Sequence, residues 1–144
     1  DKPFKIQEVK NYEDWGTLKD WENYKLQYKT LFIDLDGVIV HNSAELFEPI
    51  WGTTDGIKKN VEYLNSMYDS GKVRIIITTS RKSSFKDATI KQLKKVGLRY
   101  HDIIFDLMHC KRYLINDFSS SNSYPSSISV NLERNSNRLE EFLK

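Results

Sequence analysis

Two short and almost unbroken apolar runs, at residues 31–33 and 73–77, constrain the fold of this 144-residue chain more than any other feature. Both runs are typical of strands, and the β-branched run at residues 73–77 is typical of a parallel strand that is covered on both faces. Between them, apolar residues recur at helical spacing over residues 55–70, and Gly71 stands where a helix end favours a left-handed residue. The order strand, helix, strand predicts a parallel α/β unit.

The alternation of helices and strands continues along the chain. Ser84 followed by Asp87 resembles a capping box, and an apolar helical face then extends as far as Gly97. We therefore expect a Rossmann-like three-layer α/β/α sandwich with right-handed crossovers, a mainly parallel sheet and helices on both faces. The remaining predicted elements are strands at residues 102–105, 113–115 and 128–132 and a short helix at residues 137–144.

Charge and composition narrow the class of partner. Lys and Arg are interleaved with Asp and Glu, and the formal net charge is only +2, so no long-range field attracts nucleic acid or an anionic membrane. Cys110 is the only cysteine, which excludes an internal disulfide and fits a reducing compartment. No apolar run approaches the roughly 20 residues that span a bilayer, and residues 1–9 lack the pattern of a secretion signal. We expect a cytoplasmic protein that binds a small solute.

Polar side chains follow three of the predicted strands where each strand ends. Asp34 and Asp36 follow the first, residues 79–81 the second, and residues 116–117 the fourth. The carboxyl ends of parallel strands lie at one edge of a sheet, so we expect these groups to meet. Crowded carboxylates repel each other unless they share a cation, and hard oxygen ligands suit Mg²⁺. The sequence therefore predicts a magnesium site at this edge.

Three segments resemble motifs of the haloacid dehalogenase-like phosphatases. Residues 32–38, Phe-Ile-Asp-Leu-Asp-Gly-Val, resemble the first motif, residues 75–81 the second and residues 114–117 the fourth, in the family's order. The likeness covers about residues 30–135. Residues 89–104, 124–126 and 131–135 resemble small members tied to bacterial surface-sugar synthesis. The short interval between the first two motifs leaves no room for a large cap domain. The resemblance thus implies a capless member, with an open site or one covered by a neighbouring subunit in a homo-oligomer.

The resemblance implies a Mg²⁺-dependent phosphatase that hydrolyses a small phosphomonoester, such as a sugar or polyol phosphate of surface-polysaccharide or nucleotide-sugar biosynthesis. Asp34 would be the nucleophile, forming an aspartyl-phosphate, and would also bind Mg²⁺. Asp36 would be the general acid and base, with its backbone carbonyl on the metal. Asp117 would be the acidic metal ligand and Asn116 a further ligand, direct or through water.

The resemblance also assigns the phosphate-binding groups. Thr79 would bind a phosphate oxygen through its hydroxyl and backbone N–H, and Thr78 is the less favoured choice. Gly37 leaves room for the turn after the first strand, and it completes the predicted phosphate-binding group with Ser80 and Arg81.

The third motif departs from the family pattern. Family members carry a Lys or Arg near the phosphate, and only Lys111 and Arg112 stand in the corresponding connection. If the fourth strand began at Arg112, that residue would lie about 16 Å from the rim, because it precedes Asp117 by five extended residues. A loop over residues 109–112 that curls above the rim would bring Lys111 within reach. Arg81 is a rival, because its planar fork suits phosphate.

Residues 1–29 are expected to form an irregular lead-in to a phosphatase domain at residues 30–144. Residues 14–21 resemble the closing segment of sugar-1-phosphate nucleotidylyltransferases, which share a Gly-Thr-x-x-Asp pattern. That likeness implies that the chain is the carboxyl-terminal phosphatase part of a bifunctional polypeptide with a fused nucleotidyltransferase domain.

Two other functions compete with the phosphatase reading. The departure at the third motif and a basic helix favour a catalytically weak module that docks or scaffolds a partner nucleotidyltransferase. A phosphatase of nucleic-acid ends is disfavoured by the near-neutral charge. The basic residues of that helix region are Lys82, Lys86, Lys91, Lys94, Lys95 and Arg99.

Overall fold

The described part of the chain contains a sheet of three parallel strands. The computed structural model describes residues 8, 9, 12, 14, 16–43, 50–117, 119, 120 and 127–143. The strands β1 (Lys29–Asp34), β2 (Val73–Thr78) and β3 (Asp102–Ile104) pair in the order β1-β2-β3. The register runs from Lys29 opposite Val73 to Asp34 opposite Thr78, and β3 pairs with the last three residues of β2. The predicted α/β fold with a parallel sheet is confirmed.

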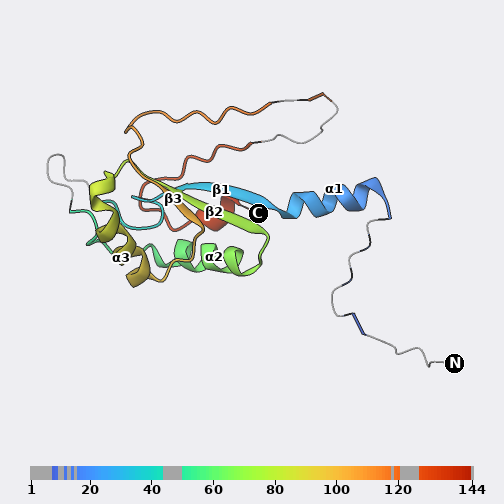
Figure 1. Cartoon of the computed structure of the whole chain (residues 1–144), viewed down its shortest axis with the longest axis horizontal. Coiled ribbons are helices and arrows are strands. Elements are labelled where there is room, and N and C mark those ends of the chain that lie inside the picture. The colour runs from blue at the N-terminus through green and yellow to red at the C-terminus, as the bar shows by residue number, and fades with distance from the viewer. Residues whose placement is uncertain are drawn as a thin grey trace.

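The two crossover helices lie on one side of the sheet (Figure 1). The first, α2 (Lys58–Asp69), links β1 to β2, and α3 (Lys86–Val96) links β2 to β3 after a 3₁₀ turn, η1 (Ser83–Phe85). Gly71 and Gly97 have φ angles of 68° and 73° just past these helices, as predicted for helix ends. The predicted capping box at the start of α3 is wrong. The chain enters this helix through η1, and the N-cap residue of α3, Phe85, makes no side-chain hydrogen bond.

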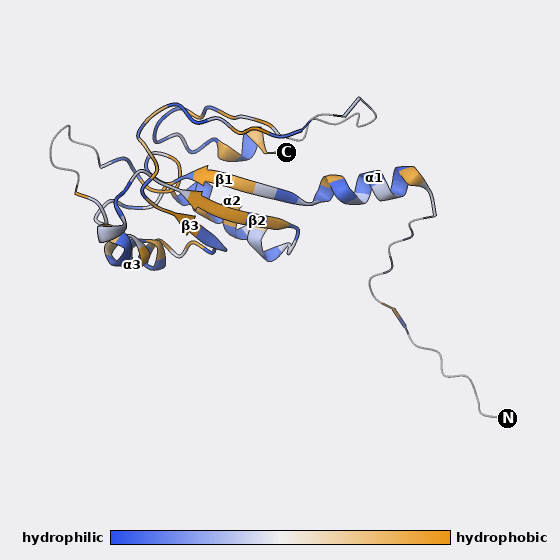
Figure 2. Ribbon diagram, turned by 45° about the horizontal axis from the view of Figure 1, so that its top comes forward, coloured by the Kyte–Doolittle hydropathy of each residue, from blue (hydrophilic) through white to orange (hydrophobic). Residues whose placement is uncertain are grey.

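The hydrophobic core fills the space between one face of the sheet and the two crossover helices. Figure 2 shows β1 and β2 as mainly apolar ribbons. On the opposite face, Phe32 is 54% exposed and Ile104 is 40% exposed, so the described residues form two layers. A second helical layer is not among them. The fully covered core residues are Leu35, Ile39, Val40, Leu64, Ile75, Ile77 and Leu93.

The chain after β3 forms none of the further strands that the sequence predicts. Residues 113–115 and 128–132 have no regular structure, and the tail forms only the 3₁₀ helix η2 (Leu139–Phe142). The side chain of Arg112 bonds to groups at the ends of β1 and β2, and no described segment other than β2 pairs with β1. In Figure 1 this connection extends away from the sheet, on the side opposite α2 and α3.

The lead-in contains a helix, α1 (Leu18–Gln27), so the expectation of an irregular segment is wrong there. Thr17 is its N-cap: the Thr17 hydroxyl oxygen accepts from Asp20 N–H at 3.2 Å, and Thr17 N–H donates to Asp20 Oδ2 at 3.0 Å. The Gly-Thr-x-x-Asp pattern therefore acts as a capping box. No residue of α1 is buried, and the helix projects away from the sheet (Figure 1). None of the described helices is long and apolar enough to cross a membrane.

The turn after β1 needs glycine at position 37. Gly37 has a φ of 91°, its N–H donates to the Val40 carbonyl at 2.7 Å, and its carbonyl accepts from Asn135 N–H at 2.7 Å. A Cβ at this position would lie 3.0 Å from Arg134 Cγ. Both the left-handed backbone and the crowding therefore oppose any side chain.

We predict that Gly37→Ala lowers the free energy of unfolding by about 2 kcal/mol. Gly71→Ala is the matched control, because Gly71 also has a positive φ but nothing within 4 Å of its added Cβ. It should lose only the backbone term, about 1 kcal/mol. Urea unfolding of both variants measures the difference. Equal losses of unfolding free energy in the two variants would show that the contact with Arg134 costs nothing. An unchanged free energy of unfolding in Gly37→Ala would contradict the turn geometry.

Candidate active site at the carboxyl edge of the sheet

The first predicted carboxylates lie where the parallel strands end. Asp34 is the last residue of β1 and pairs in register with Thr78, the last residue of β2. Asp36 follows on the turn that Gly37 closes, and an isolated bridge joins it to Val40. The Asp34 side chain is 41% exposed and that of Asp36 is 20% exposed. The strand register and the turn thus present two carboxyl groups at one edge.

A guanidinium group lies directly beside Asp34. Arg112 Nη2 donates to Asp34 Oδ1 at 3.1 Å, and Arg112 Nη1 donates to the Thr78 hydroxyl oxygen at 3.2 Å. The Thr78 hydroxyl in turn donates to the Ile33 carbonyl at 3.2 Å. Of the two basic residues predicted for this role, Arg112 makes the contact and Lys111 is exposed. The anticipated distance of Arg112 from the rim does not apply, because no strand begins at this residue.

The environment of Asp34 shifts the acidity of its carboxyl group. Partial burial raises the pKa of its carboxyl group, and the neighbouring charge of Asp36 adds to the rise. The positive charge and hydrogen bond of Arg112 act in the opposite direction, but the pKa stays above that of an ordinary aspartate. Arg112 therefore favours the ionised form of Asp34.

A second guanidinium group holds Asp36. Arg81 Nε donates to Asp36 Oδ2 at 2.8 Å and Arg81 Nη2 donates to Asp36 Oδ1 at 2.7 Å. Arg81 Nη1 donates to the Thr89 hydroxyl oxygen at 3.1 Å and to Gln92 Oε1 at 2.8 Å. The motifs do not indicate Thr89 or Gln92 as part of the site. The available signal was that these two polar residues sit on the buried face of α3.

The loop after β2 uses its own polar groups for internal bonds. Thr79 N–H donates to the Ile104 carbonyl at 3.0 Å, and the Thr79 hydroxyl oxygen accepts from Arg81 N–H at 3.1 Å. The backbone donor that the resemblance assigns to phosphate is therefore engaged within the protein. Ser80 is half-buried on the same loop. Thr78, which the sequence favoured less, is the threonine whose hydroxyl meets Arg112 beside Asp34.

The predicted metal ligands do not assemble around one point. Asn116 and Asp117 lie on the exposed stretch that follows Arg112, and in the described part of the chain no three His, Cys, Asp or Glu residues form a group that could hold a metal ion. The carboxylates of Asp34 and Asp36 each face a guanidinium instead. As arranged here, these residues do not form a complete Mg²⁺ site, so binding of the ion would require Asp117 to approach Asp34, and the magnesium requirement stays a prediction.

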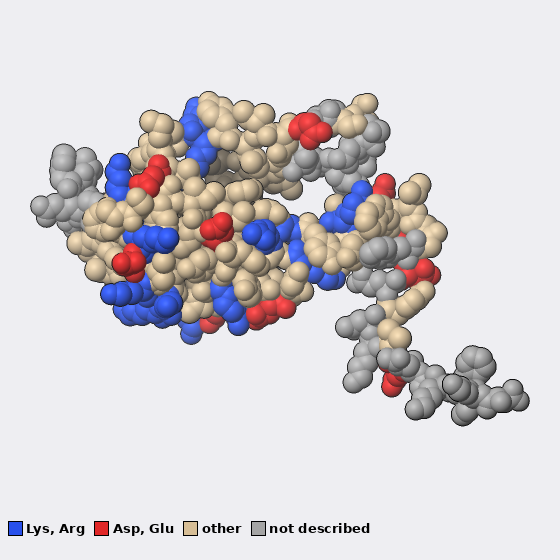
Figure 3. Space-filling view, viewed as in Figure 1, with Lys and Arg blue, Asp and Glu red and all other residues tan. Residues whose placement is uncertain are grey.

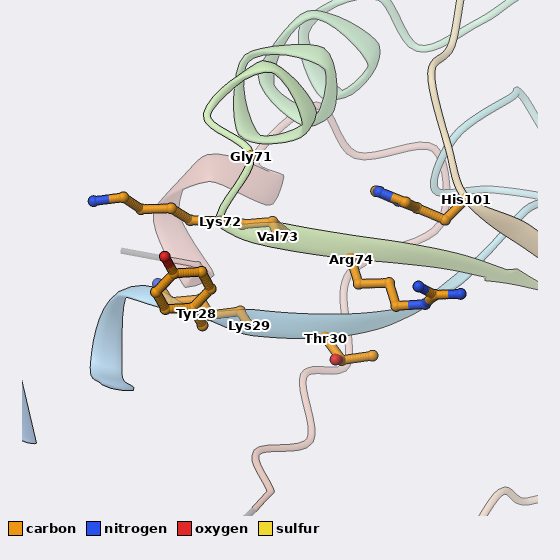
Figure 4. A pocket seen from close by; sticks show the side chains of 8 residues that line it. All are labelled: Tyr28, Lys29, Thr30, Gly71, Lys72, Val73, Arg74 and His101. Atoms are coloured by element: carbon orange, nitrogen blue, oxygen red, sulfur yellow. The ribbon is translucent and has the colours of Figure 1, made fainter. Parts of the chain in front are cut away.

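Two shallow pockets lie away from these carboxylates. One, of about 350 Å³, is found at the start of β1 and β2, at the opposite end of the strands from Asp34. Figure 4 shows Lys72 and Arg74 pointing in different directions from it. The other, of about 560 Å³, lies between His41 and the segment at residues 133–137. Neither Asp34 nor Asp36 is among the residues that line these two pockets.

Lys and Arg side chains gather over α3 on the face drawn in Figure 3.

Comparisons with family models, with curated protein sequences and with solved structures found no match to the chain. The class that the geometry itself defines is a small α/β protein with a parallel sheet and two arginine-paired carboxylates at its carboxyl edge.

Proposed function

We propose that this chain is a haloacid dehalogenase-like phosphomonoesterase that forms an aspartyl-phosphate on Asp34. The observation that carries the proposal is the contact of Arg112 with both Asp34 and Thr78, the last residues of two paired parallel strands. A carboxylate nucleophile needs a nearby cation to stabilise the charge of the transferring phosphoryl group. The finer fold of that family, with a third layer, is part of the same proposal.

The chemistry would proceed in two steps. An oxygen of Asp34 attacks phosphorus, the bond from phosphorus to the ester oxygen breaks, and Asp36 gives its proton to the departing alkoxide. Asp36 then takes a proton from a water molecule that attacks the aspartyl-phosphate. Cleavage of the bond from phosphorus to Asp34 releases orthophosphate and restores both carboxyl groups.

Arg112 would stabilise the phosphoryl oxygens throughout. A guanidinium has five N–H donors, and the contacts with Asp34 and Thr78 use two of them. The Arg112 side chain is partly exposed, so a substrate phosphate could reach the remaining donors. Its planar fork matches phosphate geometry better than the point charge of a lysine such as Lys111.

We propose a small sugar or polyol phosphate of surface-polysaccharide or nucleotide-sugar biosynthesis as substrate. The Asp34 side chain is 41% exposed, and the described residues between β1 and β2 form one helix, α2, with its flanking loops, which supports access for such esters. Mg²⁺ dependence, a cytoplasmic location, a homo-oligomer and a fused or separate nucleotidyltransferase partner belong to the same proposal. Any role of Asp117 at the site would require the segment after Arg112 to change its path.

The test is release of phosphate from 4-nitrophenyl phosphate by the purified chain, with Mg²⁺ and with EDTA, followed by a screen of phosphorylated metabolites. Turnover that EDTA abolishes and Mg²⁺ restores is expected. Turnover that survives EDTA unchanged would remove the metal from the proposal. Absence of turnover with every ester in the screen would remove the phosphatase function.

Two observations favour a second function, a catalytically weak module that docks a partner nucleotidyltransferase. Both carboxylates already have guanidinium partners, and the projecting helix α1 buries none of its residues. This function predicts no phosphate release by the purified chain, together with loss of transferase assembly when residues 30–144 are deleted from a complex. Phosphate release by the chain would decide against it.

The pH dependence provides a test of Arg112. The raised pKa of Asp34 predicts that activity falls as the pH drops through a value above the ordinary aspartate value of about 4. Arg112 lowers that pKa, so Arg112→Gln should move the acid limb of kcat/KM to higher pH and lower kcat/KM by about 100-fold. An acid limb that stays in place or moves to lower pH in this variant would contradict the assignment.

A further inference from the structure

We propose that Arg81 is a positioning residue that fixes Asp36 for proton transfer and does not bind the substrate phosphate. The inference rests on the proposed phosphatase function and assigns the buried arginine a role different from the one that the sequence motif implies. It depends on the hydrogen bonds, the burial and the second layer of contacts around the Arg81 guanidinium.

The donors of Arg81 are almost fully used inside the protein. Of the five N–H groups of a guanidinium, one on Nε and one on Nη2 go to Asp36, and Nη1 donates to Thr89 and to Gln92. Arg81 is also 0% exposed. A substrate phosphate would have to displace existing partners to reach this group. Phosphate binding therefore falls to Arg112, whose side chain is partly exposed.

The paired contacts fix the orientation of the Asp36 carboxyl group. Two parallel N–H···O bonds of 2.7 and 2.8 Å prevent rotation of the carboxylate about its bond to Cβ. Each oxygen keeps a second lone pair, so the group can still accept a proton. The side chain is 20% exposed, which leaves it open to a leaving-group oxygen. A proton donor held in this way needs little reorganisation during the reaction.

Contacts from three parts of the chain hold Arg81 in turn. Thr89 and Gln92 come from α3, and Gln92 Nε2 donates to the Thr54 carbonyl at 2.7 Å and to the Thr54 hydroxyl oxygen at 3.0 Å. The Arg81 carbonyl accepts from Asp106 N–H at 3.0 Å. A buried charge is stable only when its partners satisfy it, and this network does so with a carboxylate, a hydroxyl and an amide. The residues around Arg81 thus determine where Asp36 lies.

The experiment compares two esters that differ in their need for a proton. Departure of glycerol from glycerol phosphate requires protonation, whereas 4-nitrophenolate leaves without much assistance. The kcat/KM value for 4-nitrophenyl phosphate divided by that for glycerol phosphate reports how much the step that breaks the ester bond depends on the proton. Arg81→Lys should lower kcat/KM by about 100-fold for glycerol phosphate and by less than about 10-fold for 4-nitrophenyl phosphate. Inhibition by inorganic phosphate should stay the same.

Other outcomes would overturn the positioning role. Equal losses for both esters, with weaker inhibition by inorganic phosphate, would show that Arg81 binds phosphate. A lower melting temperature with an unchanged ratio of the two kcat/KM values would show a structural role only. If the wild-type chain hydrolyses neither ester, the proposed function itself fails. If it hydrolyses both and the ratio does not move in the variant, only the role of Arg81 fails.

Two further variants keep the test decisive. Gln92→Met removes a partner of Arg81 without touching Asp36, and it should shift the ratio in the same direction by several-fold even if Arg81→Lys does not fold. Arg99→Lys is the control for loss of a guanidinium, because Arg99 pairs with Asp69 on the surface at 2.7 Å. It should leave the ratio unchanged. A ratio that is unchanged in Gln92→Met as well would contradict the inference.

Discussion

Replacing Asp34 with asparagine is expected to lower kcat for 4-nitrophenyl phosphate by about 10⁴-fold or more. Loss of a covalent nucleophile removes the whole two-step pathway, and effects of this size are typical of such residues. Asparagine keeps the shape of the side chain and can still accept a hydrogen bond from Arg112 through its amide oxygen. The measurement is steady-state phosphate release by the two proteins prepared in parallel.

The stability of this variant shows whether lost activity reflects lost chemistry. The folded-state pKa of Asp34 is raised, so its contribution to stability is present below the unfolded value of about 4 and is lost as the pH rises through the folded value. At neutral pH the neutral asparagine should therefore not destabilise the fold, and any gain should vanish below about pH 4. A folded Asp34→Asn variant with near wild-type turnover would remove Asp34 from its role.

Asp36→Asn is expected to lower kcat/KM for glycerol phosphate by about 10³-fold, the second largest effect. The rate at which the aspartyl-phosphate forms from 4-nitrophenyl phosphate should fall much less, because that leaving group needs little protonation. Hydrolysis of the intermediate should be slow, because no base would activate water. A burst of 4-nitrophenolate followed by a slow steady rate, recorded by stopped-flow absorbance, is the expected signature.

The comparison with Asp34→Asn separates the two carboxylates. Asp34→Asn should give neither a burst nor steady turnover, whereas Asp36→Asn should give the burst alone. Equal losses for the two esters without a burst would argue against Asp36 as the proton-transfer group. Since Asp36→Asn also changes the partner of Arg81, a melting curve has to accompany the kinetics.

Local sequence signals were sufficient to predict the central part of the fold. The β-branched run of β2 and the apolar run of β1 indicated two neighbouring parallel strands. The structure pairs them in this way, and the core lies against them. Gly71 and Gly97 mark helix ends because only glycine adopts a left-handed backbone without cost. The positions of Asp34 and Asp36 follow from the end of β1 and the turn at Gly37.

The remaining structure depends on long-range partners that a local pattern does not contain. The apolar residues 113–115 were predicted as a strand, but a strand needs a neighbour, and this segment pairs with none of the described strands. The pairing of Arg81 with Asp36 joins residues 45 positions apart. In α1 the capping signal was present at Thr17 and Asp20, but the absence of an apolar stripe concealed the helix.

The proposed mechanism requires that phosphate becomes covalently attached to Asp34. The most direct measurement is an acid quench of the chain during turnover of radiolabelled 4-nitrophenyl phosphate, in the presence of Mg²⁺, followed by peptide mapping. Label is predicted on the peptide that contains Asp34, and hydroxylamine, which cleaves acyl phosphates, should release it. If the wild-type chain turns over the ester but neither it nor the Asp36→Asn variant carries label on that peptide, phosphate does not pass through Asp34.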